Sequence, residues 1–223
     1  SVYKLPPKRA ANFLIQIAKG LQYAHRHDIV HQDIKPANIL VLPDDKIKIL
    51  DFGLACPVGS ENFLTGTPFY MSPEQVQCFP VDQRSDIYSL GLVVYEMLTG
   101  RRPFEGNDQW KVMEMRTDRD IPDPAELVPD MPGPLRDFIR KACARDPEKR
   151  FRNIAEVLAS IKSLAAEYGL TNGGPYEPKR KIRMFYLVYG DEETKELKAA
   201  VDDFNIKMQR IGVDLKAGDL IDL

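Results

Sequence analysis

The sequence predicts a mainly helical α+β fold that contains one small β-hairpin. Apolar residues recur at helical spacing in several stretches, two short apolar runs flank a turn-forming Pro-Asp-Asp, and prolines and glycines stand where helices would begin and end. The chain has 223 residues, of which 43% are hydrophobic and 29% are charged. This is ordinary globular usage, enough for one good core and a small appendage.

The N-terminal region predicts one long helix and one hairpin. Leu5-Pro6-Pro7 precede a helix that extends to about His25, because proline is favoured in the first turn of a helix. Residues 38–42 and 46–50 predict two strands, and Pro43-Asp44-Asp45 predicts the turn between them. The apolar face of the helix consists of Ala10, Phe13, Leu14, Ile17, Ala18 and Leu21.

The middle of the chain predicts the core. Residues 87–99 are almost all apolar and Gly100 follows them, which is typical of a buried helix that ends at a glycine. Ser85 or Asp86 is the expected cap at its start. Further helices are expected near residues 110–115, 135–144 and 154–167, with an irregular, proline-rich connection over residues 117–134.

The C-terminal part differs in composition. Residues 169–181 are rich in glycine and proline and predict a linker. Residues 182–189 predict a strand, and residues 192–211 predict an amphipathic helix. Residues 182–223 are therefore expected to form a partial α/β segment, either the start of a separate domain or a small extension packed on the preceding fold.

Charge and cysteine content exclude several classes of protein. The formal net charge is −2, so no basic excess indicates nucleic acid or an anionic membrane as a partner. Cys56, Cys78 and Cys143 are widely spaced and odd in number, which favours reduced thiols in a cytoplasmic protein over disulfides or a zinc site. No apolar run reaches the ~18 residues that a membrane span requires, and no signal peptide is expected.

Four polar residues around the hairpin carry the chemistry. Asp33 can accept a hydrogen bond from an attacking hydroxyl, and Lys35 can meet a transferring phosphoryl group as a compact cation. Asn38 and Asp51 offer hard oxygen ligands for Mg²⁺, which binds through one or two carboxylates plus substrate phosphates. The hairpin would bring both ligands to one place. This set predicts phosphoryl transfer.

The order His-Gln-Asp-Ile-Lys-Pro-Ala-Asn at residues 31–38, followed by Asp51-Phe52-Gly53, resembles the catalytic and metal-binding loops of protein kinases. Residues 66–74, Gly-Thr-Pro-Phe-Tyr-Met-Ser-Pro-Glu, are similar to the end of a kinase activation segment. Thr67 and Lys35 match the serine/threonine type, and the sequence as a whole resembles that of bacterial members of the family. The resemblance covers residues 2–168 and corresponds to the C-terminal lobe of the kinase fold.

The resemblance implies a role for each matching residue. Thr67 would touch Asp33 and Lys35, and Leu40 would pack under the adenine of ATP. Glu74 would pair with Arg150, since a carboxylate held in an interior is costly alone. The implied structural residues, which include the Asp that hydrogen-bonds the backbone of the catalytic loop, are His31, Phe52, Glu74, Asp86 and Arg150.

Two residues depart from the kinase pattern. Gln32 replaces a frequent arginine, and Cys56 stands where many kinases have a basic residue. In the family those cations bind a phosphorylated activation loop, so a phosphate on Thr65 would have less to bind here. Phosphorylation of Thr65 is therefore expected to matter less.

No G-x-G-x-x-G loop and no V-A-I-K-like strand occurs in the sequence, so a kinase N-terminal lobe is not expected within these residues. We expect residues 1–168 to be the catalytic lobe of a serine/threonine kinase that uses ATP and Mg²⁺ to phosphorylate proteins, with little activity as this chain alone.

One alternative is a non-catalytic lobe that binds another protein as a scaffold or inhibitor. A small-molecule phosphotransferase is less favoured, because residues 67–74 are of the protein-substrate type. The face that carries Leu40 would be uncovered, and self-association through it is expected.

Overall fold

The computed structural model of the chain describes residues 4–42, 45–52, 54–57 and 67–170. The mainly helical fold with a small hairpin is confirmed for these residues. Gly53, Thr65, most of the expected linker and the expected segment over residues 182–223 lie outside them. The elements are α1 (Pro7–His25), β1 (Ile29–Val30), η1 (Pro36–Asn38), β2 (Ile39–Val41), β3 (Ile47–Ile49), β4 (Cys56–Pro57), α2 (Pro73–Val76), α3 (Gln83–Thr99), α4 (Gln109–Asp118), η2 (Pro124–Glu126), α5 (Gly133–Ala142), η3 (Pro147–Lys149), α6 (Ile154–Ser160) and α7 (Lys162–Glu167).

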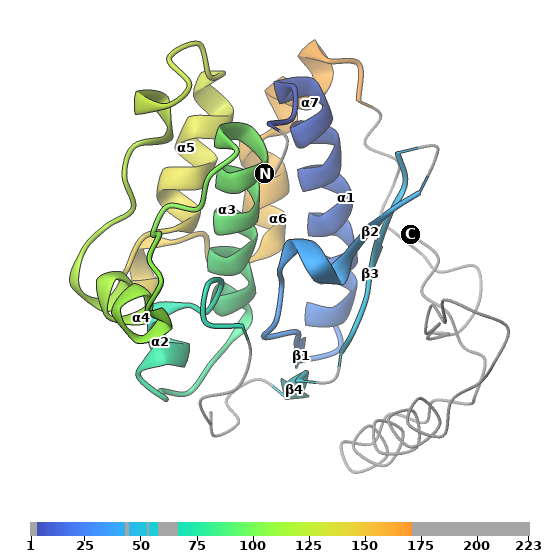
Figure 1. The fold of residues 1–223 in the computed structure, drawn as a ribbon. Helices are drawn as coiled ribbons and strands as arrows, with labels where there is room; N and C mark the ends of the chain where they lie inside the picture. Colours follow the sequence, from blue (N-terminus) through green and yellow to red (C-terminus); the bar gives the residue numbers. More distant parts are fainter. Residues whose placement is uncertain (1–3, 43–44, 53, 58–66, 171–223) are drawn as a thin grey trace, which may run out of the picture.

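Helix α3 lies at the centre of the core, and α1 and α5 pack against it (Figure 1). It is buried nearly all round, as its apolar sequence predicts. Helices α3 and α5 approach closely at Gly91, where an added Cβ would lie 2.5 Å from the Sγ of Cys143. Helix α6 packs against both α1 and α5 and completes the helical layer.

Helix α3 begins earlier than the sequence indicated. Its cap is Asp82, whose side chain accepts a hydrogen bond from the backbone of the first turn at 2.7 Å. Ser85 and Asp86 are therefore wrong as caps: both lie inside the helix, and their side chains reach other segments of the chain. The end of the helix is as expected, because Gly100 has the left-handed conformation (φ 72°).

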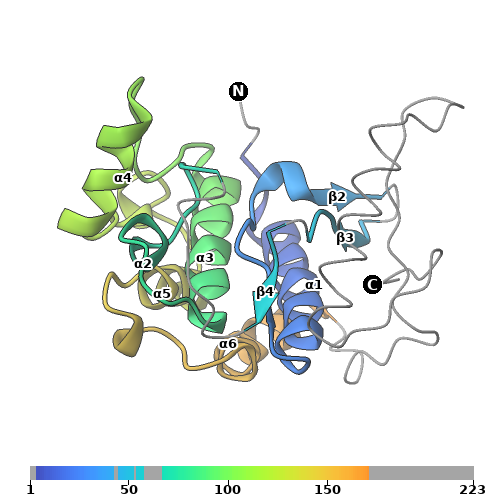
Figure 2. The same ribbon diagram turned by 90° about the horizontal axis from the view of Figure 1, so that it is seen from below.

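Strands β2 and β3 form the expected hairpin, with Ile39 opposite Ile49 and Val41 opposite Ile47. Gln16 of α1 anchors it, because its amide nitrogen donates to the carbonyl of Asp45 at 2.9 Å. Its amide oxygen accepts from the N–H of Ile47 at 3.0 Å. The hairpin consequently lies along α1, on the side away from α2 and α4 (Figure 2).

A second small sheet was not expected from the sequence. Strand β1 pairs antiparallel with β4, with Ile29 opposite Pro57 and Val30 opposite Cys56. Strands of two residues show no alternation that a sequence pattern could reveal. This sheet joins the approach to the 31–38 loop to the segment that follows the hairpin.

The single helix expected over residues 154–167 is two helices, α6 and α7, separated at Ile161. Ser160 precedes the break, and its hydroxyl donates to the carbonyl of Val157 at 2.7 Å. A hydroxyl that bonds to the backbone in this way competes with the helical hydrogen bonds and bends the helix.

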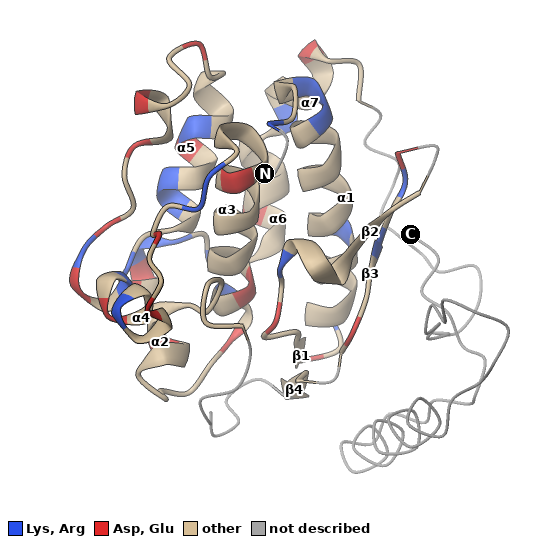
Figure 3. Ribbon diagram, viewed as in Figure 1, with Lys and Arg blue, Asp and Glu red and all other residues tan. Residues whose placement is uncertain are grey.

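Acidic and basic side chains are mixed along the described helices and loops (Figure 3). Most of α1 and α3 is drawn without charge in this view, in keeping with the many apolar residues that these two helices contribute to the core. Among the described residues, no helix has the length and apolar character that crossing a membrane requires.

Candidate active site

Asp33, Lys35 and Thr67 form a hydrogen-bonded triangle. The ammonium of Lys35 donates to Oδ2 of Asp33 and to Oγ1 of Thr67, both at 2.6 Å. The backbone N–H of Thr67 donates to the other carboxylate oxygen of Asp33, Oδ1, at 3.1 Å. Since Asp33 is only 6% exposed, groups from two distant segments hold its carboxylate in one orientation.

Asn38 completes this group. Its amide nitrogen donates to the backbone carbonyl of Asp33 at 2.8 Å and to Oδ2 of the same residue at 3.1 Å. The one-turn helix η1 makes this return possible, because Pro36 opens it with a fixed φ. With its nitrogen directed to Asp33, Asn38 keeps its amide oxygen as the atom that could bind a cation.

The backbone of the 31–38 loop is strained at Gln32, whose φ is +66°. This left-handed conformation costs a non-glycine residue about 1–2 kcal/mol. Asp86 offsets the cost: its buried carboxylate accepts from the N–H groups of His31 and Gln32, both at 2.8 Å. Burial alone would raise the pKa of Asp86, but the hydrogen bond from His25 and the backbone donors hold this pKa below its usual value.

His31 links the loop to the end of the hairpin. Its Nδ1 accepts from the N–H of Asp33 at 3.3 Å, so the proton lies on Nε2, which donates to the carbonyl of Leu50 at 3.1 Å. Burial lowers the pKa of His31 and keeps the ring neutral. The ring also packs on Phe52, with 4.5 Å between ring centroids. His31 and Phe52 therefore position Asp51, which lies between Leu50 and Phe52 in the sequence.

Asn38 and Asp51 approach each other through the hairpin. The N–H of Leu50 donates to the carbonyl of Asn38 at 2.8 Å, so Asp51 directly follows the position paired with Asn38. Asp51 is exposed and has a φ of +60°, which turns the chain away from the strand. Within the described ranges no three His, Cys, Asp or Glu residues gather as a metal site. An amide oxygen and one carboxylate nevertheless fit Mg²⁺, because this ion takes its remaining ligands from phosphates and water.

Glu74 and Arg150 form the expected ion pair. Arg150 donates through both terminal nitrogens to the two carboxylate oxygens of Glu74, at 2.7 and 2.8 Å. The hydroxyl of Ser85 adds a third hydrogen bond at 2.6 Å. Burial favours a raised pKa for Glu74, but the bonds from Arg150 and Ser85 lower this pKa below its usual value. The pair ties α2 to the helical core and leaves the carboxylate charged.

Three residues of the site were missed by the sequence analysis. His25, at the end of α1, has its Nε2 2.7 Å from Oδ2 of the buried Asp86. Gln75 donates to the carbonyl of Gln32 at 2.8 Å. Arg116 of α4 is buried and donates to the backbone of residues 68–71. The side chains meet partners more than 40 positions away, so no local pattern could indicate them.

The face that carries Leu40 is less apolar than expected. Ile39, which lies on the other face of β2, is buried in the core, whereas Leu40 is half-buried and Val41 is 39% exposed. Lys48 lies opposite Leu40 on β3. The uncovered face is therefore mixed, with Leu40 beside a lysine.

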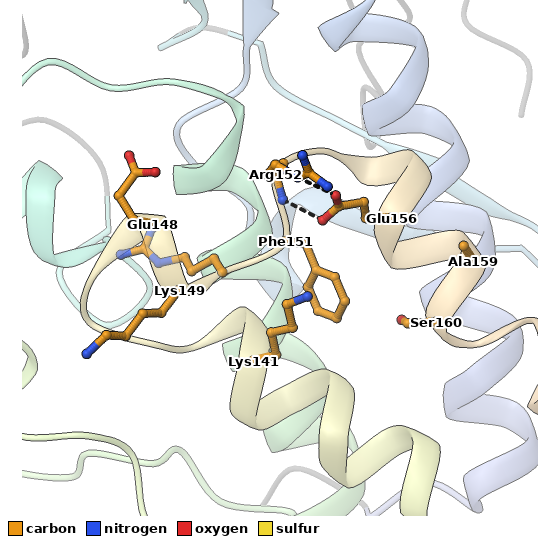
Figure 4. A pocket seen from close by; sticks show the side chains of 9 residues that line it. Lys141, Glu148, Lys149, Phe151, Arg152, Glu156, Ala159 and Ser160 are labelled. Atoms are coloured by element: carbon orange, nitrogen blue, oxygen red, sulfur yellow. Dashed lines mark hydrogen bonds and ion pairs between the residues drawn. The ribbon is translucent and has the colours of Figure 1, made fainter.

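A separate surface pocket lies between α5, η3 and α6 (Figure 4). Phe151 forms its floor, with the Lys141 ammonium 4.4 Å from the ring centroid. Arg152 and Glu156 pair across one wall at 2.6 Å. Of the predicted site residues only Arg150 lines this pocket, and Arg150 is engaged with Glu74. The pocket is thus distinct from the group around Asp33.

Comparison with known proteins identifies relatives of the chain. The model of the protein kinase domain family matches residues 2–160. A probable serine/threonine-protein kinase of Clostridium acetobutylicum is 39% identical over 171 residues, which are 74% of this chain and 26% of the relative. Serine/threonine-protein kinase PknL of Mycobacterium tuberculosis is 36% identical over 171 residues, 74% of this chain and 43% of that protein.

Serine/threonine-protein kinase PrkC of Bacillus subtilis is 37% identical over 164 residues, 71% of this chain and 25% of that protein. The chain therefore spans between 25% and 43% of the length of these curated relatives.

Proposed function

The chain belongs to the serine/threonine protein kinase family, and from this premise we propose that it transfers the γ-phosphoryl group of ATP to serine or threonine hydroxyls of proteins. The observation that carries the proposal is the orientation of Asp33, whose two carboxylate oxygens are held by Thr67 and Lys35. We assign residues 1–168 to the C-terminal lobe of the kinase fold, which supplies this catalytic group.

Each residue of the group has one task in the proposed reaction. Asp33 accepts the hydrogen bond of the substrate hydroxyl and takes its proton as the oxygen bonds to the γ-phosphorus. The bond from that phosphorus to the bridging oxygen breaks, and ADP leaves with the electron pair. Lys35 lies 2.6 Å from Asp33 and balances the negative charge that develops on the transferring group.

Asn38 and Asp51 would hold Mg²⁺ on the nucleotide side of Asp33. The ion would supply charge neutralisation for the β- and γ-phosphates. Leu40, half-buried on β2 next to Asn38, would contact the adenine from below. These assignments rest on the donor types and their placement in one hairpin.

Thr67 supports a protein substrate of the serine/threonine type. Its hydroxyl accepts from Lys35 while its backbone binds Asp33, so residues 67–71 begin beside the reacting group. A polypeptide substrate can then lie along these residues with its hydroxyl at Asp33. The cysteines of the described part, Cys56, Cys78 and Cys143, are free thiols, which is compatible with the reducing cytoplasm we propose as the place of action.

Transfer of labelled phosphate tests the proposal. The product of the complete reading frame that contains this chain is incubated with [γ-³²P]ATP, Mg²⁺ and casein as the test protein, and phosphoserine and phosphothreonine are separated. We expect label on serine or threonine at rates of about 1–100 s⁻¹ for a good substrate. The 223-residue chain alone should be far slower, because its sequence holds no glycine-rich phosphate loop. Label confined to tyrosine, or no label with the complete product, would contradict the proposal.

A further inference from the structure

Arg116 is a buried cation that pairs with no carboxylate in the part of the chain that the structure describes. It lies on α4 with 1% of its surface exposed, and its Nε has no hydrogen-bond partner there. Burial lowers the pKa of this guanidinium, which reports the cost of keeping the charge inside. Because a buried cation without an ion-pair partner is costly, its remaining hydrogen bonds are what offset the cost of burying Arg116.

Those remaining hydrogen bonds all go to one short segment. Nη1 donates to the carbonyls of Pro68 and Met71, the latter at 3.0 Å, and Nη2 donates to the carbonyl of Phe69. The carbonyl of Tyr70 accepts from the hydroxyl of Ser89 at 2.7 Å. Every carbonyl from residue 68 to residue 71 is therefore bound from the side of α3 and α4.

The segment of residues 68–71 directly follows Thr67, which contacts Asp33 and Lys35. Thr67 immediately precedes Pro68, and it binds Asp33 through its N–H and Lys35 through its hydroxyl. Within the segment, the N–H of Tyr70 donates to the carbonyl of Thr67 at 2.9 Å and closes a turn. A shift of residues 68–71 away from α4 would thus pull Thr67 from Asp33.

We propose that Arg116 is a positioning residue for phosphoryl transfer, which holds residues 68–71 against α4 and thereby fixes Thr67 against Asp33. This inference rests on the proposed function. Lysine could not replace it fully, because a guanidinium presents several donors in a fixed plane and can bridge three carbonyls, whereas an ammonium is a single point of charge. The role concerns the protein substrate, because residues 67–71 meet Asp33 at Oδ1 through the N–H of Thr67, whereas Asn38 meets Asp33 at Oδ2.

Amide hydrogen exchange tests the contact without any enzymatic activity. The 223-residue chain is compared as wild type, Arg116→Met, Arg116→Lys and the control Arg119→Met, since Arg119 is exposed near the same helix end. We expect protection of the Tyr70 amide to fall at least about tenfold in Arg116→Met, less in Arg116→Lys and not in Arg119→Met. If Arg116→Met does not fold, Arg116→Lys and Ser89→Ala carry the comparison. Equal protection in Arg116→Met and Arg119→Met would overturn the inference.

Steady-state kinetics test the role. In the product of the complete reading frame, Arg116→Met should lower kcat/KM for the protein substrate by about 10- to 100-fold, with KM for ATP unchanged. Arg116→Lys should recover part of this loss. An equal rise in both KM values, or lost protection at Tyr70 with unchanged kcat/KM, would mean a merely structural residue and would overturn the inference. A wild-type product without transfer would contradict the proposed function itself, while hydrogen exchange would still decide the contact.

Discussion

Gln32 donates a hydrogen bond from its side-chain amide to the sulfur of Cys56. These are the two residues that depart from the kinase pattern, and the structure places them in contact through the pairing of β1 with β4. In relatives with cations at both positions, a phosphate would be needed to hold two like charges together. Here two uncharged side chains join the loop to β4 without a phosphate.

Loss of the phosphorylatable residue should therefore have little effect. Thr65→Ala in the product of the complete reading frame should lower kcat by less than about threefold, which corresponds to about 0.7 kcal/mol of activation free energy. Initial rates with casein measure this. A matched background, Gln32→Arg with Cys56→Lys, restores the cations, and there Thr65→Ala should cost more. A large loss from Thr65→Ala in the native background would show that the amide–thiol contact does not replace the phosphate.

The ion pair of Glu74 and Arg150 should dominate the polar contribution to stability. Arg150→Met leaves the Glu74 carboxylate buried without its partner, so the free energy of unfolding should fall by about 3–5 kcal/mol. Urea unfolding of the 223-residue chain measures the change. The control is Glu156→Gln, because Arg152 of that pair is 84% exposed and its loss should cost less than about 0.5 kcal/mol. Similar losses in both variants would refute the distinction between the pairs.

Stability should decrease towards acid in two stages. His31 has a lowered pKa in the folded state, so below its usual value of 6.5 the unfolded chain binds a proton that the folded chain does not, and stability falls. Glu74 and Asp86 also have lowered pKa values, so their contribution is present above their usual values of 4.5 and 3.8 and is lost as the pH falls through the folded values.

The urea midpoint, measured from pH 8 to pH 4, tests this expectation. It should be level above about pH 7, decrease below about pH 6.5 and fall more steeply below about pH 4.5. Glu74→Gln should weaken the second stage only. A midpoint that rises between pH 7 and pH 5 would show that His31 is charged in the folded state.

Elements whose sequence pattern lies within a single stretch of residues could be predicted. Helices α1 and α3 and the β2–β3 hairpin were predictable, because the apolar spacing and the turn residues act within each stretch. The β1–β4 sheet was not, since two-residue strands 26 positions apart share no local signal. The cap of α3 was placed wrongly because Ser85 and Asp86 form long-range contacts that outweigh capping.

The same division holds for the site. Asp33, Lys35 and Asn38 lie within six residues of one another, so their grouping follows from one loop and one turn of helix. His25 and Arg116 act on partners that only the packing of α1 and α4 brings close. Arginine is almost never fully buried without an ion-pair partner, and the contact of His25 with Asp86 depends on packing between distant segments, so the sequence could not reveal either role.

Self-association through the hairpin stays a prediction. Leu40 is half-buried beside Lys48, so the attraction should be weak and appear only at high concentration. Sedimentation velocity of the 223-residue chain at tens of micromolar should show dimers in wild type that Leu40→Glu removes, with Lys48→Glu as the control for charge. A wild-type monomer at this concentration would contradict self-association through this face.

Comparing Asp51→Asn with Asp130→Asn distinguishes loss of a metal ligand from a general effect on folding. Asp51→Asn should remove a magnesium ligand, and transfer should fall steeply at ordinary Mg²⁺ concentrations. Asp130→Asn is the matched control, because Asp130 is exposed and distant in sequence from both loops. Each variant should melt within a few degrees of wild type, since neither Asp51 nor Asp130 is buried.

The rate of phosphoryl transfer by Asp33→Asn, in the product of the complete reading frame, tests the central claim most directly. Asparagine keeps the shape of the side chain but cannot accept the hydroxyl proton, so kcat should fall by about 10²- to 10⁴-fold while the variant still folds and binds ATP. A variant that folds, binds ATP and transfers phosphate to casein at the wild-type rate would contradict the role of Asp33 and with it the proposed mechanism.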